Sequence, residues 1–301
     1  MAYAKTDDGV DLYYEAEGDG PAIVFVHEFA ADLNSWSRQR AHFQGRHRCL
    51  AFNARGYPPS VVPADPASYS QARAVADVLA VMDHAGIAQA HVVGLSMGGF
   101  AALMLGLDHP DRALSVCVAG AGYGAEPDQR DRFREEARGS AEFLSKHGAA
   151  AFAQRYMSGP TRIPYKRADP EGFEKFCARM AGLSALGLAN TQLGVQRERP
   201  SLYALRERLA GYRVPALIVN GDEDWPCLLP GVMLKRVMPT AALVVLPNCG
   251  HTINEEAPDA LNRALEGFYT QIAEGRWPVR DPAAMADTIT GMNAPAAGSQ
   301  P

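Results

Sequence analysis

The chain lacks the patterns that define several classes of protein. Its five cysteines are scattered without a C-x-x-C pair, so the sequence predicts neither a disulfide framework nor a zinc site. No apolar stretch of about 18 residues occurs, and we therefore expect no transmembrane helix and no membrane partner. The net charge is −5 without a concentrated basic face, which argues against a nucleic-acid partner. The dinucleotide fingerprint G-x-G-x-x-G is absent as well, so we expect protein groups alone to carry any chemistry, with no cofactor and no metal.

The remaining composition is that of an ordinary globular protein. Of the 301 residues, 47% are hydrophobic and 21% are charged, and this length permits one large α/β domain or two smaller ones. An odd number of widely spaced cysteines fits a reducing compartment. Acidic residues occur near the start of the chain, where a secretory signal needs an apolar run, so we expect a cytoplasmic location.

Short apolar runs alternate with helical patterns in the first part of the chain. A hairpin is expected around Asp8-Gly9, and buried strands are expected at 22–26, 49–52, 91–93 and 114–119. Between them, residues 71–85 carry apolar side chains at helical spacing. Alternation of this kind predicts an α/β fold, with a mostly parallel sheet covered by helices on both faces.

Residues 121–212 break this alternation. They show no clear strand and read as an inserted helical unit, after which strands are expected at 215–220 and 242–246 and a closing helix at 258–273. We therefore expect a core formed by residues 1–120 and 213–275, an insert at 121–212, and a C-terminal tail at 276–301. An exposed face of the insert could also carry a homodimer contact.

The segment Gly94-Leu95-Ser96-Met97-Gly98 reads G-x-S-x-G and lies between an expected strand and an expected helix. A serine in this position is typical of a nucleophile elbow, where a sharp turn exposes the hydroxyl at the edge of the sheet. The motif is short, and the alternative is a simple turn of small residues. Partners in the right order downstream decide between the two.

Two polar segments follow later strands, at the sheet edge where ligands bind in open parallel sheets. Residues 221–226 include Asp224 and Pro226, and His251 directly follows Gly250. The order Ser96, Asp224, His251 is that of the α/β-hydrolase triad, and with G-x-x-D and G-H the chain resembles a capped α/β-hydrolase over roughly residues 3–273.

The resemblance implies roles for these three residues. Ser96 would be the nucleophile, His251 its base, and Asp224 the acid that orients the histidine. Asp222 and Glu223 are competing acids, although the family spacing favours Asp224.

The resemblance also places the oxyanion hole. Its donors would be the backbone N–H groups of Met97 and Phe29, the latter from the loop 27–30. Glu28 stands where the family usually has glycine. Two interpretations are open. In the first, Glu28 is a surface residue or is paired with an arginine such as Arg55. In the second, its carboxylate orients water or repels anionic substrates.

In this family the insert at 121–212 would be the cap, which closes an apolar pocket over the serine. Candidate lining residues are Glu28, Phe29, Trp36, Tyr123, Phe152, Tyr156, Met157, Trp225 and Ile253. Most of the aromatic residues among them fit a plain core equally well.

The serine favours one chemistry and disfavours others. Dehalogenases and epoxide hydrolases of this fold use a carboxylate nucleophile, so the leading hypothesis is hydrolysis of a small-to-medium, largely apolar carboxylic ester through an acyl-enzyme. The partner would thus be a small-molecule substrate. Alternatives are carbon–carbon bond hydrolysis of a diketo acid, which an arginine in the pocket would favour, perhydrolase or haloperoxidase activity, acyl transfer, amide hydrolysis, and a non-catalytic ligand receptor.

Overall fold

The computed structural model describes residues 2–285 and 289, and its centre is one eight-stranded sheet. In chain order the strands are β1 (Ala2–Lys5), β2 (Asp11–Glu17), β3 (Ala22–Val26), β4 (Arg48–Phe52), β5 (Ala90–Leu95), β6 (Ala113–Ala119), β7 (Ala216–Gly221) and β8 (Ala241–Leu246). Their spatial order is β1-β2-β4-β3-β5-β6-β7-β8. The pairs β1–β2 and β2–β4 are antiparallel, and every other neighbouring pair is parallel. The expected α/β class is therefore confirmed.

Helices account for most of the rest of the described chain. They are α1 (Ser37–Phe43), α2 (Gln71–His84), α3 (Met97–Asp108), α4 (Arg130–Tyr156), α5 (Ile163–Ala168), α6 (Pro170–Ala181), α7 (Ala185–Thr191), α8 (Arg206–Ala210), α9 (Trp225–Val237), α10 (Ile253–Glu256) and α11 (Pro258–Ala273). Two short elements matter below: the 3₁₀ turn η5 (Pro160–Arg162) and the π-helical turn η6 (Gln192–Gln196). Over residues 2–285, none of these helices is long and apolar enough to cross a membrane.

The sheet is buried on both faces because its central strands are apolar at most positions. Along β3, Val24 and Val26 belong to one core cluster, while Ile23 and Phe25 belong to the other. This alternation follows from the two-residue period of a strand. Side chains of α2, α3 and α9 complete the first cluster, and side chains of α1 and α11 complete the second, so the helices form two outer layers.

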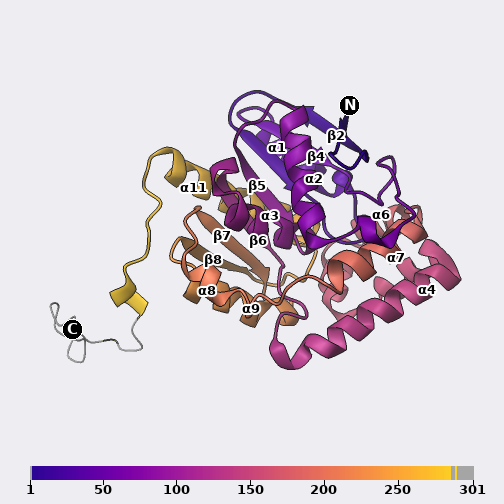
Figure 1. The fold of residues 1–301 in the computed structure, drawn as a ribbon. Helices are drawn as coiled ribbons and strands as arrows, with labels where there is room; N and C mark the ends of the chain where they lie inside the picture. Colours follow the sequence, from indigo (N-terminus) through magenta and orange to yellow (C-terminus); the bar gives the residue numbers. More distant parts are fainter. Residues whose placement is uncertain (1, 286–288, 290–301) are drawn as a thin grey trace.

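A third cluster lies outside the sheet and joins it to the helical segment between β6 and β7. There, Met97 and Phe29 from the core pack with side chains of α4 and α6 such as Phe152 and Phe176. The helices α4, α6 and α7 stand together beside the sheet (Figure 1). Helix α4 is broken at Gly148, whose backbone leaves the helical conformation. Of the expected tail at 276–301, residues 286–288 and 290–301 lie outside the described part.

Ser96 lies between the last residue of β5 and the first residue of α3, with φ 54° and ψ −109°. A non-glycine residue with this backbone is strained, and such strain persists only where the surroundings enforce it. Here the surroundings are backbone. A Cβ on Gly94 would overlap the carbonyl oxygen of Gly98, and a Cβ on Gly98 would overlap that of Val26. The two glycines therefore allow β5, α3 and β3 to meet around the serine.

Gly94→Ala should consequently be severely destabilising. The atoms that the new methyl group meets are backbone, which cannot rotate away, so we expect a loss of about 4 kcal/mol or more in the free energy of unfolding. Urea unfolding followed by circular dichroism measures it. As a control, Gly267 in α11 has open space around its Cβ position, and Gly267→Ala should gain about 0.5–1 kcal/mol. Equal stabilities of the two variants would contradict the steric argument.

Candidate active site

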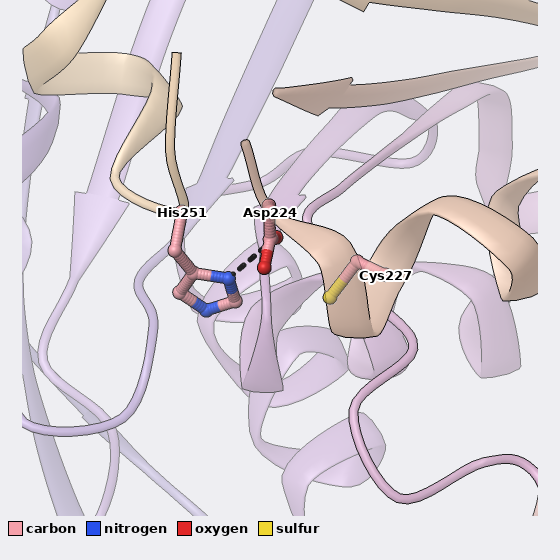
Figure 2. Close-up of side chains that lie close together, drawn as sticks. All are labelled: Asp224, Cys227 and His251. Atoms are coloured by element: carbon pink, nitrogen blue, oxygen red, sulfur yellow. Dashed lines mark hydrogen bonds and ion pairs between the residues drawn. The ribbon is translucent and has the colours of Figure 1, made fainter. Parts of the chain in front are cut away.

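Two side chains that the sequence singled out are in direct contact at the carboxyl edge of the sheet. Nδ1 of His251 lies 2.7 Å from Oδ2 of Asp224, and both residues are buried. Asp224 follows β7 and precedes α9, whereas His251 lies in the loop after β8 (Figure 2). The neighbouring Asp222 instead accepts a hydrogen bond from the backbone N–H of Cys249 at 3.1 Å, which braces the same two loops. The carboxylate bonded to the imidazole is thus that of Asp224.

Ser96, Asp224 and His251 line one cavity of about 710 Å³. This volume lies within the range of small-molecule sites in proteins. The serine reaches the cavity from the β5–α3 turn, and the other two residues reach it from loops after β7 and β8. Parallel strands bring all three to one edge, although they are far apart in the sequence.

The environment of His251 changes its basicity. Burial by itself would lower the pKa of the imidazole, but the charge and hydrogen bond of Asp224 outweigh it, and the pKa lies above its usual value. Two further charges make smaller contributions to this pKa: Arg162 lowers it and Glu28 raises it. Oε2 of Glu28 lies 3.9 Å from Nε2 of His251. A neutral imidazole beside Asp224 carries its proton on Nδ1, which leaves Nε2 as the basic atom.

The loop that carries His251 is held from two sides. The carboxylate of Glu256 accepts hydrogen bonds from the backbone N–H groups of Gly250 at 2.6 Å and Thr252 at 2.7 Å. On the other side, the N–H of His251 donates to the carbonyl oxygen of Thr161 in η5 at 3.2 Å. The helical segment therefore supports the histidine loop directly.

Glu28 is buried and paired with Arg162, which also comes from η5. The guanidinium donates to the two carboxylate oxygens at 2.5 and 3.1 Å, and it contacts the hydroxyls of Thr252 and Tyr156 as well. Neither member of the pair is more than 2% exposed. A buried ion pair of this kind is favourable only with good geometry, because both charges have lost their hydration.

The structure confirms one part of the simpler interpretation of Glu28, the pairing with an arginine, and corrects the rest. Its side chain is not at the surface, and its partner is not Arg55. Arg55 instead donates to the carboxylates of Asp77, at 2.7 Å, and Asp8, at 2.8 Å. The sequence did not indicate Arg162, because nothing in the local pattern marks one arginine of the insert as buried.

The loop after β3 is fixed by His27, a residue to which the sequence gave no role. Its Nε2 accepts a hydrogen bond from the N–H of Ala54 at 3.0 Å, so Nδ1 carries the proton and donates to the carbonyl of Glu28 at 2.7 Å. Burial lowers the pKa of His27, which favours this neutral form. The loop thereby holds Phe29 beside the Met97 end of α3, within one cluster of buried side chains. Met97 is the first residue of α3, where a backbone N–H has no acceptor within the helix.

The expected pocket residues separate into two groups. Tyr123, Tyr156 and Phe152 line the cavity. Trp36 packs on the ring of Phe25 in the core, Ile253 belongs to the same core cluster, and Met157 lies in the cluster under the insert. Trp225 is 75% exposed. These side chains are therefore placed away from the cavity, since each packs into a neighbouring layer or faces outward.

Polar residues of the insert also line the cavity, and the sequence did not identify them. They include Arg132, Glu136, Arg155, Arg162, Gln192, Gln196 and Arg199. Gln192 and Gln196 lie at the two ends of the π-helical turn η6, and both are buried. π-Helical turns occur often at functional sites, but no simple sequence signal marks them.

Asp224 and His251 also lie close to Cys227, the third side chain in Figure 2. One ligand atom from each lies within 4.8 Å of the others, so the group resembles a metal site in geometry. A metal ion needs the thiolate, however. Burial and the nearby Asp224 carboxylate raise the pKa of Cys227 well above its usual value, and the thiol contacts the carbonyl oxygen of Gly120 at 3.3 Å. These three residues therefore fit a metal ion poorly.

The sheet order, the strained turn at Ser96 and the loops that carry Asp224 and His251 define the α/β-hydrolase class of fold. The chain has the α/β-hydrolase fold, and the sequence model of the α/β-hydrolase fold family matches residues 21–162. The crystal structure of the enol-lactonase from Burkholderia xenovorans superposes with a TM-score of 0.77 at 26% identity, over 89% of this chain and 99% of that one.

Two curated relatives align with this chain over nearly their whole length. The 3-oxoadipate enol-lactonase 2 of Acinetobacter baylyi is 28% identical over 264 residues, which is 87% of this chain and 94% of the relative. The putative carbamate hydrolase RutD of Azorhizobium caulinodans is 28% identical over 280 residues, covering 90% of this chain and 99% of the relative. Both names describe hydrolases.

The Glu28–Arg162 pair should make a large and strongly coupled contribution to stability. Removing one partner leaves the other charge buried and unpaired, so Arg162→Met or Glu28→Gln should each cost about 3–5 kcal/mol of unfolding free energy. The double variant should cost much less than the sum of the two. A double-mutant cycle in urea measures this coupling, and additive losses would show that the pair is not coupled.

Proposed function

We propose that this protein is a serine hydrolase that cleaves a small-to-medium carboxylic ester through an acyl-enzyme, with Ser96 as nucleophile, His251 as base and Asp224 as the orienting acid. The observation that carries the proposal is the 2.7 Å contact between His251 and Asp224, in a cavity that Ser96 also lines from a strained turn. These are the parts that nucleophilic catalysis by serine requires.

Each residue has one task in the proposed reaction. Nε2 of His251 takes the hydroxyl proton as the serine oxygen forms a bond to the ester carbonyl, and it then gives that proton to the departing alcohol. Asp224 keeps the other ring proton on Nδ1 and stabilises the imidazolium. Water, deprotonated by the same histidine, then cleaves the acyl-enzyme to the acid and restores the serine.

The negative charge that develops on the carbonyl oxygen needs fixed donors. We assign these to the backbone N–H groups of Met97, at the start of α3, and Phe29, in the loop that His27 braces. Glu28 directly precedes Phe29 in the sequence, and its charge would oppose the oxyanion if it were unpaired. Its ion pair with Arg162 offsets that charge, and this explains how a glutamate is accommodated beside an oxyanion hole.

We further propose that the helical segment 121–212 acts as the cap over this site. Its residues supply most of the cavity lining opposite Ser96, and η5 contacts the His251 loop. A cap of this kind excludes water and sets substrate choice. The relatives support ester-like substrates, since one is named as an enol-lactonase and another as a carbamate hydrolase.

One observation favours a second candidate function. Carbon–carbon bond hydrolases with this triad act on anionic diketo acids, and the cavity contains arginine side chains, including Arg199. Both reactions would use Ser96 and His251 in the same way. Turnover of a dienoic diketo acid, measured as the loss of its absorbance, would distinguish carbon–carbon bond hydrolysis from ester hydrolysis.

The proposal is tested by turnover of 4-nitrophenyl acetate and butyrate. We expect the wild type to release nitrophenol, and Ser96→Ala to lose about 10⁴-fold or more in kcat, as when a serine nucleophile is removed elsewhere. A serine-directed phosphonate should label the wild type at Ser96, as read by peptide mass spectrometry. Release no faster than from Ser96→Ala would overturn the esterase proposal, and an adduct on another residue would overturn the choice of nucleophile.

The rate should fall on the acid side of neutrality. His251 must be neutral to accept the serine proton, and its pKa is raised, so the protonated form persists to higher pH than for a free imidazole. We therefore expect kcat/KM to decrease as the pH falls through a value above about 6.5. A pH-rate profile from 5 to 9 measures this, and a flat profile between 5 and 8 would exclude a histidine base.

Matched variants of the two aspartates provide the control for this profile. Asp224→Asn should cost about 10⁴-fold in kcat and shift the acid limb to lower pH, because the carboxylate that raises the pKa of His251 is gone. Asp222→Asn removes an equal charge but only a loop contact, so the limb should stay in place. The reverse ranking would identify Asp222 as the acid.

A further inference from the structure

The proposed substrate cavity contains one buried positive charge without a carboxylate partner among the described residues. It belongs to Arg199, which is 3% exposed and lies three residues after Gln196, the last residue of η6. Its guanidinium donates to the side-chain oxygen of Gln196 and, at 2.6 Å, to the carbonyl oxygen of Tyr123. Both acceptors are neutral, so the charge itself is not compensated.

The other arginines that line the cavity differ from Arg199. Arg162 is paired with Glu28, and Arg132 lies 3.6 Å from Glu136. Arg155 is exposed and lies over the ring of Phe143. Each of these charges is therefore balanced by a carboxylate or hydrated, which leaves Arg199 as the cation whose environment lacks a counter-charge.

The position of Arg199 is fixed by two aromatic rings. The guanidinium carbon lies 4.1 Å from the ring centre of Phe100 and 4.7 Å from that of Phe133. Phe100 is one turn into α3, and its N–H donates to the carbonyl of Ser96 at 3.0 Å. The charge is thus held on the same helix end that presents the serine, and both residues line the same cavity.

A buried, uncompensated charge is costly to the folded protein, and a bound anion would supply the missing counter-charge. Burial lowers the pKa of Arg199 to about 9, so the side chain is still a cation at neutral pH. Nearby Arg130, which donates to the backbone carbonyl of Arg199, makes this end of the cavity more positive. Of the five N–H donors of a guanidinium, two are used here, so three remain for a ligand.

We propose that Arg199 forms a carboxylate subsite, and that the substrate of the Ser96 centre is an ester or lactone that also carries a free carboxylate. This rests on the proposed function only for the cleaved bond, since the anion site stands on its own geometry. Gln192 is also buried and lines the same cavity. The substrate is then charged at one end, rather than largely apolar.

The first experiment measures anion binding without turnover. Adipate and the neutral adipamide are titrated by calorimetry into Ser96→Ala, and into Ser96→Ala combined with Arg199→Met or Arg197→Met. Arg197 lies two residues away on the same segment, is partly exposed and does not line the cavity, so it controls for the loss of one positive charge. We expect adipate alone to bind, with at least tenfold weaker binding after Arg199→Met and no change after Arg197→Met. Failure of adipate to bind, or binding unaffected by Arg199→Met, would overturn the subsite.

The second experiment compares 4-nitrophenyl hydrogen adipate with its methyl-capped, neutral counterpart. The wild type should prefer the acid in kcat/KM by about 10- to 100-fold, the range expected for hydrogen bonds to a charged group, and Arg199→Met should bring the ratio of the two kcat/KM values to about one. If neither ester is turned over faster than by Ser96→Ala, the esterase proposal fails while the calorimetric result still decides the subsite. If Arg199→Met does not fold, the subsite is tested by the preference of the wild type and of Arg199→Lys for the acid over the neutral ester. Equal rates for the two esters refute the subsite.

Discussion

The close approach of three backbone segments around Ser96 is the constraint on which the rest of the site depends. Strand β5, helix α3 and the end of β3 meet where Gly94 and Gly98 leave no space for a side chain. This contact forces the serine into a strained backbone conformation and turns the start of α3 toward the cavity. The proposed nucleophile and one proposed oxyanion donor are thus set by main-chain packing, which side-chain motion cannot relax.

A second level of organisation is electrostatic and joins the helical segment to the core. Glu28 and Arg162 are both buried, and each would be costly alone. The pair also sets the field around His251, because Glu28 raises the pKa of the imidazole and Arg162 lowers it. Glu28 stands where the family usually has glycine, and Arg162 comes from the insert. Together their opposite charges keep the region next to the proposed oxyanion close to neutral.

The sequence predicted the core well because its signals are local. Strand β3 and helix α11 begin and end where expected, since an apolar run or a helical period marks each residue of them. The contact of Asp224 with His251 also follows from local motifs at known strand ends. The partner of Glu28 and the burial of Arg199 could not be predicted, because they depend on how distant segments pack. Arg162 is 134 residues away from Glu28, and no pattern near either one indicates the contact.

The bond from the N–H of His251 to the carbonyl of Thr161 has a consequence for how a small molecule enters. Lifting η5 away from the core would break this bond, separate Arg162 from Glu28 and release the loop that carries His251 at the same time. Passage is therefore expected elsewhere. The cavity residues Arg132, Glu136, Gly139 and Arg155 are exposed and all lie on α4, so we expect a small molecule to enter along that helix while η5 stays in contact with the core.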